Sequence, residues 1–212
     1  MINVLGKTPK ILVIGDLMID HYLWGSSERI SPEAPVPIVS VNNESTLLGG
    51  AGNVINNLKA LGAGVDVMSV IGECEVSGEL KSLLDGIKID TQYLVTEANR
   101  IGSKKTRIIA AQQQVVRYDQ ENSDEINKTS QKALLSNYSK KIAEYDCVLL
   151  SDYGKGVLTH ELTPQLISIA NQHSVKVLVD PKGANYSKYK GAYLLTPNKK
   201  EASGATGIII NN

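Results

Sequence analysis

The sequence contains no phenylalanine, a single tryptophan and only two cysteines among its 212 residues. A core without phenylalanine has to be filled by aliphatic side chains. Cys74 and Cys147 lie too far apart in the chain to form a metal-binding CxxC pair, and Cys147 stands in an apolar run where a buried, unreactive thiol is expected. Such sparse use of cysteine favours a reducing cytoplasm over an oxidising exterior.

An excess of charge of either sign is also missing, because 22 Lys and Arg residues balance 22 Asp and Glu residues. With no net charge, the protein has no overall positive electrostatic potential that would attract nucleic acid or an anionic membrane, so we expect neither as a partner. The beginning of the sequence shows no apolar stretch typical of a signal peptide, and no apolar run approaches the ~20 residues that span a bilayer. We therefore expect a cytoplasmic protein that meets anionic ligands through local geometry.

What the sequence does contain is an alternation of short apolar runs with helical patterns. The runs are typical of buried parallel strands and lie at residues 11–14, 65–70, 147–150 and 175–179, with a weaker one at 193–195. Apolar residues recur at helical spacing within 51–61, 134–142 and 162–170, and Thr163-Pro164 is the predicted N-cap and first-turn proline of the last helix. This alternation predicts one α/β domain with a mostly parallel sheet covered on both faces.

Two segments interrupt the alternation. Residues 20–41 contain Pro32, Pro35 and Pro37, which exclude a regular helix, and they end in a β-like stretch. Residues 105–118 contain two β-rich runs joined by glutamines. We expect these segments to form a small side sheet with bounds of about 20–41 and 92–119.

Polar side chains follow four of the predicted strands. They are, in chain order, Asp16 and Asp20, Asp152 and Lys155, Asp180 and Lys182, and Asn198 and Glu201. A single aspartate after a strand is usually a turn former or a helix cap. Because the carboxyl ends of parallel strands meet at one edge of a sheet, four such groups together favour a ligand site.

A glycine-rich segment, Gly-Gly-Ala-Gly-Asn at residues 49–53, opens the first predicted helix. Glycines let backbone amides approach a ligand closely, and the amide of Asn53 can both donate to and accept from sugar hydroxyls. A flexible loop would have the same composition, so the cluster alone is weak evidence. No clear strand precedes it, the order is not GxGxxG, and no GxxxxGK[ST] occurs, which disfavours dinucleotide-binding and P-loop folds.

Together with Gly62 and Gly72, this glycine segment resembles the first signature of the PfkB carbohydrate kinases, and Asn-Lys-Lys-Glu at 198–201 is similar to the NxxE element of that family. Within the family, Ile-Ser-Pro-Glu-Ala-Pro-Val-Pro at 30–37 resembles the heptose-7-phosphate kinases of lipopolysaccharide core synthesis, as do residues 151–156, 180–183 and 195–198. The resemblance extends from about residue 11 to residue 201. It implies a ribokinase-like three-layer α/β/α fold in which the side sheet is a β-lid.

The resemblance also implies a sugar-phosphate substrate, with ATP and Mg²⁺ as cofactors. Because residues 105–118 carry apolar side chains on a two-stranded element that is only marginally stable alone, we also expect a homodimer formed through the lid. The implied substrate-binding residues are Asp16, Asp20, Gly49, Gly50, Asn53 and Asp152, with Arg29, Lys105, Arg107 and Arg117 for the phosphate that the sugar already carries. A solvated lid face is an equal alternative for those basic residues. The implied phosphate and ATP side comprises Lys155, Asp180, Lys182, Asn198 and Glu201, of which Asn198 and Glu201 would act on Mg²⁺ through water.

The late Gly-Ala-Gly-Asp motif that supplies the catalytic base of these kinases is absent from the sequence. Gly-Ala-Thr-Gly at 204–207 lacks the aspartate, and the tail from Ser203 is expected to break the helix after Glu201. We therefore expect residues 1–212 to be the N-terminal part of one kinase domain, inactive alone, from a parent in which an adenylyltransferase domain is an open question. Two alternatives remain: another PfkB sugar or nucleoside kinase, and a non-catalytic sugar-binding or dimerisation module.

Overall fold

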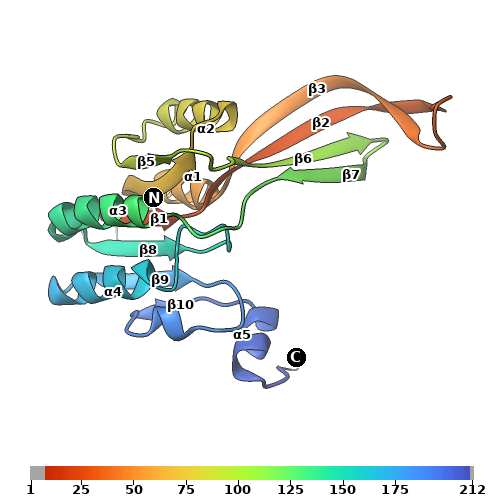
Figure 1. The fold of residues 1–212 in the computed structure, drawn as a ribbon. Helices are drawn as coiled ribbons and strands as arrows, with labels where there is room; N and C mark the ends of the chain where they lie inside the picture. The colour runs from red at the N-terminus through yellow and green to blue at the C-terminus, as the bar shows by residue number, and fades with distance from the viewer. Residues whose placement is uncertain (1–7, 211–212) are drawn as a thin grey trace.

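The main sheet of the computed structural model, which describes residues 8–210, consists of six parallel strands in the order β10-β9-β8-β1-β4-β5 (Figure 1). Their bounds are β1 (Lys10–Gly15), β4 (Gly64–Gly72), β5 (Leu94–Glu97), β8 (Cys147–Ser151), β9 (Lys176–Asp180) and β10 (Leu194–Leu195). Residues 1–7, which bear on the predicted lack of a signal peptide, lie outside the described residues, as do residues 211–212.

Helices cover both faces of this sheet. They are α1 (Ala51–Ala60) and α2 (Glu75–Gly86) on one face, and α3 (Lys128–Lys141) and α4 (Leu162–Gln172) on the other. Helix α5 (Lys199–Thr206) follows β10 and has no buried residue, and the short 3₁₀ turns are η1 (Ile142–Glu144) and η2 (Ser187–Tyr189). Side chains alternate along β1, so Leu12 and Ile14 join a core with α3 and α4, whereas Val13 joins a second core with α1 and α2. Two cores on opposite faces confirm the predicted three-layer α/β/α fold.

A second sheet projects from the main one as a long ribbon (Figure 1). Its strand order is β3-β2-β6-β7, with bounds β2 (Leu17–Ile30), β3 (Pro37–Gly50), β6 (Ser103–Ala110) and β7 (Gln113–Gln120). The expected side sheet is present, but its bounds differ from 20–41 and 92–119. Strand β3 continues to Gly50, so the glycine segment does follow a strand, and residues 94–97 belong to the main sheet as β5.

The lid joins the main sheet almost without connecting residues on one side. Only Asp16 separates the end of β1 from the start of β2, and β3 passes directly from Gly50 into α1 at Ala51. Gly50 has a φ of 55°, and a Cβ there would lie 2.5 Å from the carbonyl oxygen of Asp16. A residue without a side chain is therefore required where the lid returns to the sheet.

Two helix ends differ from the sequence-based expectation. Helix α4 begins at Leu162, so Thr163 lies in its first turn, and the hydroxyl of Thr159 accepts a hydrogen bond from the Leu162 amide at 2.9 Å. Helix α5 continues past Ser203 and ends at Gly207, which has a φ of 70°. The predicted break at Ser203 is therefore wrong: the helix ends about one turn later, at Gly207 in the left-handed conformation.

No helix within residues 8–210 is both long and apolar enough to cross a membrane. Cys74 and Cys147 are free thiols. Cys147 is half-buried rather than fully buried, and burial raises the pKa of its thiol. A raised pKa keeps a thiol protonated and unreactive, as the sequence predicted for this residue.

Candidate functional site

The four strands that carry polar residues at their ends are consecutive neighbours in the main sheet, in the order β10-β9-β8-β1. Their register aligns Gly15 with Ser151 and Ser151 with Asp180, so the strands end level with one another. The residues that follow therefore meet at one edge, as the sequence predicted.

Asp16 lies beneath this edge and is almost completely buried. The residue is 1% exposed, and its carboxylate accepts hydrogen bonds from the backbone amides of Tyr153 (2.8 Å), Lys155 (3.1 Å) and Val157 (3.1 Å). Burial raises the pKa of Asp16, and the hydrogen bonds from these amides oppose that rise. Asp16 thus holds the loop after β8 in place, and its predicted contact with sugar hydroxyls stays a prediction.

Asp152 is enclosed in a similar way. Its Oδ2 accepts hydrogen bonds from the Lys188 ammonium (2.6 Å) and the Tyr189 hydroxyl (2.7 Å), and its Oδ1 accepts one from the Gly154 amide (2.8 Å). The Tyr189 hydroxyl in turn accepts from the amide of Lys182 at 3.1 Å. Asp152 therefore ties the loop after β8 to the loop after β9, and its predicted contact with the sugar stays a prediction.

One face of the lid carries two rows of charged and aromatic residues. Residues directly opposite each other on neighbouring strands share a face. The register of β2, β6 and β7 places Asp20, Lys105 and Asp119 in one row, and Tyr22, Arg107 and Arg117 in the next. The predicted lid residues Lys105, Arg107 and Arg117 are therefore brought together with Asp20.

Asp20 is held by the lid itself. Its Oδ1 accepts from the Arg107 guanidinium at 2.5 Å, and this hydrogen bond raises the pKa of Arg107. A Cβ on Gly49 would lie 2.4 Å from the Asp20 Oδ2, so glycine at this position leaves room for the carboxylate. Asp20 and Asn53 both line a hollow of about 300 Å³ beside the edge strand β3, and the two predicted sugar ligands therefore share one space.

Asn198 and Glu201 at the start of α5 form a reciprocal cap. The Asn198 side chain accepts from the Glu201 amide, and the Glu201 carboxylate accepts from the Asn198 amide, both at 3.0 Å. The other oxygen of Glu201 lies 3.4 Å from the Lys182 ammonium. The NxxE element is thus a capping box, a local signal that the sequence alone contains.

The carboxylate of Asp180 lies near that of Glu201. Burial raises the pKa of Asp180, and the negative charge of Glu201 raises it further. Residues 8–210 contain no cluster of three or more His, Cys, Asp or Glu side chains placed to hold a metal. A pair of carboxylates fits a hydrated Mg²⁺, which usually keeps several waters and binds phosphate as well.

Arg29 is not brought to the site. It pairs with Ile38 near the tip of the lid, nine positions along β2 from Asp20, or roughly 30 Å at strand spacing. Because Arg29 lies near the tip, it is far from the other residues predicted to hold the phosphate of the sugar.

Sequence reasoning missed several residues that the structure places at the site. Tyr153 lies between the lid and the strand ends. Burial raises the pKa of its hydroxyl, and the negative charges of Asp180 and Asp20 raise it further. Glu121 follows β7 and contacts both Lys105 and Lys155. Lys188 and Tyr189 hold Asp152. Their partners are distant in the sequence, so no local pattern marked them.

Comparison with known proteins places the chain among kinases. The model of the pfkB family of carbohydrate kinases matches residues 8–211. The chain is 65% identical over 209 residues to the bifunctional protein HldE of Aliarcobacter butzleri, and 58% identical over 205 residues to that of Sulfurimonas denitrificans. These matches cover 99% and 97% of the chain but only 44% and 43% of the two relatives. The chain therefore spans less than half the length of these curated relatives.

Solved structures share the fold. A structure of phosphofructokinase-2 from Escherichia coli matches 97% of the chain and 66% of its own, with a TM-score of 0.71 and 18% identity. Ribokinase of Arabidopsis thaliana, solved with ribose and ATP, matches 95% of the chain and 64% of its own, with a TM-score of 0.64 and 17% identity. The match of the family model over nearly the whole sequence decides the assignment: the chain belongs to the pfkB family of carbohydrate kinases.

Proposed function

We propose that the full-length protein transfers the γ-phosphate of ATP to the anomeric hydroxyl of D-glycero-D-manno-heptose 7-phosphate, a step toward ADP-heptose and the lipopolysaccharide inner core. The observation that carries this proposal is the charged face of the lid, where Asp20 and Arg107 lie beside Lys105 and Arg117, close to the polar ends of the main strands. The identity of the sugar is supported by likeness to the HldE proteins.

In this proposal Asp20 and Asn53 bind the hydroxyls of the sugar, and the lid cations bind its 7-phosphate. Lys182 faces the phosphates of ATP, and Asp180 with Glu201 and Asn198 organises a hydrated Mg²⁺, which would neutralise charge on the transferring phosphoryl group. The catalytic base and the adenine site would be supplied by residues that follow in the longer protein. The other half of the relatives, which are described as bifunctional, supports an adenylyltransferase as a second domain. Two free cysteines are consistent with action in the cytoplasm.

The test is ADP release by the full-length protein with a panel of acceptors: heptose 7-phosphate, fructose 6-phosphate, ribose and adenosine. The heptose phosphate is expected to give the highest kcat/KM. A preference for a pentose, a hexose or a nucleoside would indicate another PfkB kinase. Binding of a sugar phosphate without turnover of any acceptor would indicate a non-catalytic module.

Replacement of Asp20 by alanine in the full-length protein is expected to weaken binding of heptose 7-phosphate by about 1.5–3 kcal/mol, the usual contribution of a charged hydrogen bond. The carboxylate can accept hydrogen bonds through both of its oxygens, and its Oδ2 lies next to Gly49, where the absence of a side chain leaves space. Isothermal titration calorimetry measures the change. Asp85→Ala, an exposed aspartate on α2, is the control and should leave affinity unchanged. Equal affinity of the Asp20→Ala variant and the wild type would remove Asp20 from the sugar site.

The lid is also expected to form a dimer contact. Val116 and Tyr118 on β7 are 46% and 54% exposed, and a small sheet with exposed apolar side chains needs a partner surface. Light scattering of the full-length protein is expected to give a dimer, and the double variant Val116→Lys/Tyr118→Lys a monomer. Gln120→Lys adds one positive charge to the same strand and should remain dimeric. A monomeric wild type would contradict the proposed interface.

A further inference from the structure

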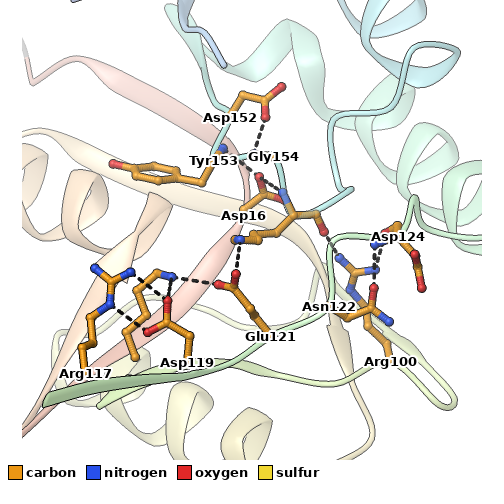
Figure 2. A network of polar contacts seen from close by, with 12 residues as sticks. Asp16, Arg100, Arg117, Asp119, Glu121, Asn122, Asp124, Asp152, Tyr153 and Gly154 are labelled. Carbon is orange, nitrogen blue, oxygen red and sulfur yellow. Dashed lines mark hydrogen bonds and ion pairs between the residues drawn. The ribbon is translucent and has the colours of Figure 1, made fainter. Parts of the chain in front are cut away.

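Glu121 is the anionic group that joins the lid to the main sheet. Its Oε2 accepts from the Lys105 ammonium at 2.8 Å, and its Oε1 accepts from the Lys155 ammonium at 2.6 Å (Figure 2). Lys105 belongs to β6 of the lid, whereas Lys155 belongs to the loop after β8. A single carboxylate therefore occupies the point at which ammonium groups from two separate sheets converge.

This point is partly shielded from water. The side chains of Lys105 and Lys155 are 17% and 15% exposed, and that of Glu121 is 26% exposed. Hydrogen bonds from Lys105 and Lys155 hold the pKa of Glu121 below its usual range, so the carboxylate is ionised at neutral pH. Charge-assisted hydrogen bonds of this kind are stronger than neutral ones. Glu121 thus supplies counter-charge to both partly buried lysines, and Lys105 shares it with Asp119.

The surrounding charges define what else would bind here. Lys105 also contacts Asp119 at 3.0 Å, and the Nε of Arg117 contacts Asp119 at 3.0 Å (Figure 2). If Glu121 moves away, Lys105, Lys155 and Arg117 carry three positive charges against the one negative charge of Asp119. The ion pair of Asp20 with Arg107 beside them adds no net charge, so the site has a net charge of +2. A phosphate monoester carries about −1.5 to −2 at pH 7, so it matches this charge.

Glu121 is the carboxylate that can leave. Asp119 is fixed within β7, where Lys105 is its cross-strand partner, whereas Glu121 follows the end of β7 at Gln120. The segment after Glu121 has its own anchor, because the guanidinium of Arg100 donates to the carbonyl oxygens of Asp124 and Lys155 (Figure 2). The lid and the loop therefore stay connected when Glu121 is displaced.

We propose that the Glu121 carboxylate is an internal substitute for the phosphate of the ligand: it holds Lys105 and Lys155 in the unliganded protein, and a phosphate monoester displaces it and takes both lysines. This inference rests on the proposed function and identifies the pair of lysines that receives the phosphate. An internal competitor weakens binding of free phosphate, which gains nothing elsewhere. A sugar phosphate also gains the contacts of its hydroxyls, so it is selected over inorganic phosphate.

The experiment is isothermal titration of the full-length protein with inorganic phosphate at low ionic strength. Glu121→Gln removes the competing charge and is expected to bind phosphate about tenfold tighter than the wild type. Glu28→Gln, an exposed glutamate on the lid, is the matched control and should bind phosphate as the wild type does. Lys105→Gln in the Glu121→Gln background should abolish the gain.

Phosphate affinity of Glu121→Gln equal to or weaker than that of the wild type overturns the inference. Glu121→Asp keeps the charge but is too short to reach both lysines, so its phosphate affinity should lie between those of the wild type and Glu121→Gln. Melting temperature and circular dichroism verify that each variant is folded. The acceptor panel tests the proposed function separately: a gain in phosphate affinity without heptose phosphorylation would uphold the two-lysine site and reject the heptose kinase.

Discussion

The 212-residue chain, assayed alone with heptose 7-phosphate, ATP and Mg²⁺, is expected to release ADP about 10⁴-fold or more slowly than the full-length protein. A sugar hydroxyl is a poor nucleophile, and a positioned base typically contributes about 10²–10⁴-fold, with one oxyanion donor adding about 10²–10³-fold. The sequence has no Gly-Ala-Gly-Asp motif that would supply both.

The carboxylates at the sheet edge do not replace that base. Asp16 accepts from three backbone amides, and Asp152 is bound by Lys188 and Tyr189. Asp20 is paired with Arg107. Asp180 remains, and burial raises its pKa, but its neighbours Glu201 and Lys182 place it on the predicted nucleotide side.

A coupled ADP-release assay compares the chain with the full-length protein. The variant Asp180→Asn in the chain serves as a control for residual activity, because loss of a weak rate in this variant would identify Asp180 as a substitute base. Turnover of the chain within tenfold of the full-length protein would show that the catalytic base lies within residues 1–212, contrary to the expectation.

Asp16→Ala is expected to lower the stability of the full-length protein by about 3 kcal/mol or more, since each buried donor left unpaired costs about 1–3 kcal/mol. The backbone amides of Tyr153, Lys155 and Val157, all in the loop after β8, lose their acceptor. Urea unfolding followed by circular dichroism measures the change in midpoint.

Asp85→Ala, on the exposed side of α2, should change the free energy of unfolding by no more than about 0.5 kcal/mol. Asp16→Asn keeps one acceptor oxygen but turns an NH₂ group toward amide donors, so it should be intermediate. If Asp16→Ala is as stable as the control, the loop after β8 does not depend on this carboxylate.

The main sheet and the edge that carries the site could be predicted from the sequence. Buried parallel strands are continuous apolar runs, so strands at residues 147–150 and 175–179 can be recognised in the sequence. The polar residues that follow such strands then have to meet at one edge of the sheet. Helix α2 was missed because Gly78 and Gly86 interrupt a short pattern. The full length of β2 and β3 was missed because an exposed lid strand has no buried face to impose a clear alternation.

The roles of single carboxylates could not be predicted in the same way. Asp16 and Asp20 both follow the first strand, yet one is buried against amides 137 to 141 residues away and the other lies on the lid beside Arg107. A strand reverses its side-chain direction at every residue, but the partners on each side are set by distant segments. Local sequence therefore predicts the candidate site without distinguishing a carboxylate buried against backbone amides from one that lies on the lid.

Because β1 passes through the single residue Asp16 into β2, a change in backbone torsion at Asp16 would rotate the whole strand β2 relative to the main sheet. Strand β2 has 14 residues, so its arm is about 45 Å long at strand spacing, and a rotation of about 5° at its base would carry the tip through about 4 Å. Asp16, at the base of this strand, also accepts a hydrogen bond from the backbone amide of Lys155 in the loop after β8. Small torsional changes in that loop would thus be amplified mechanically at Arg29 and the proline turn, where a fluorescent label placed on the tip would report them.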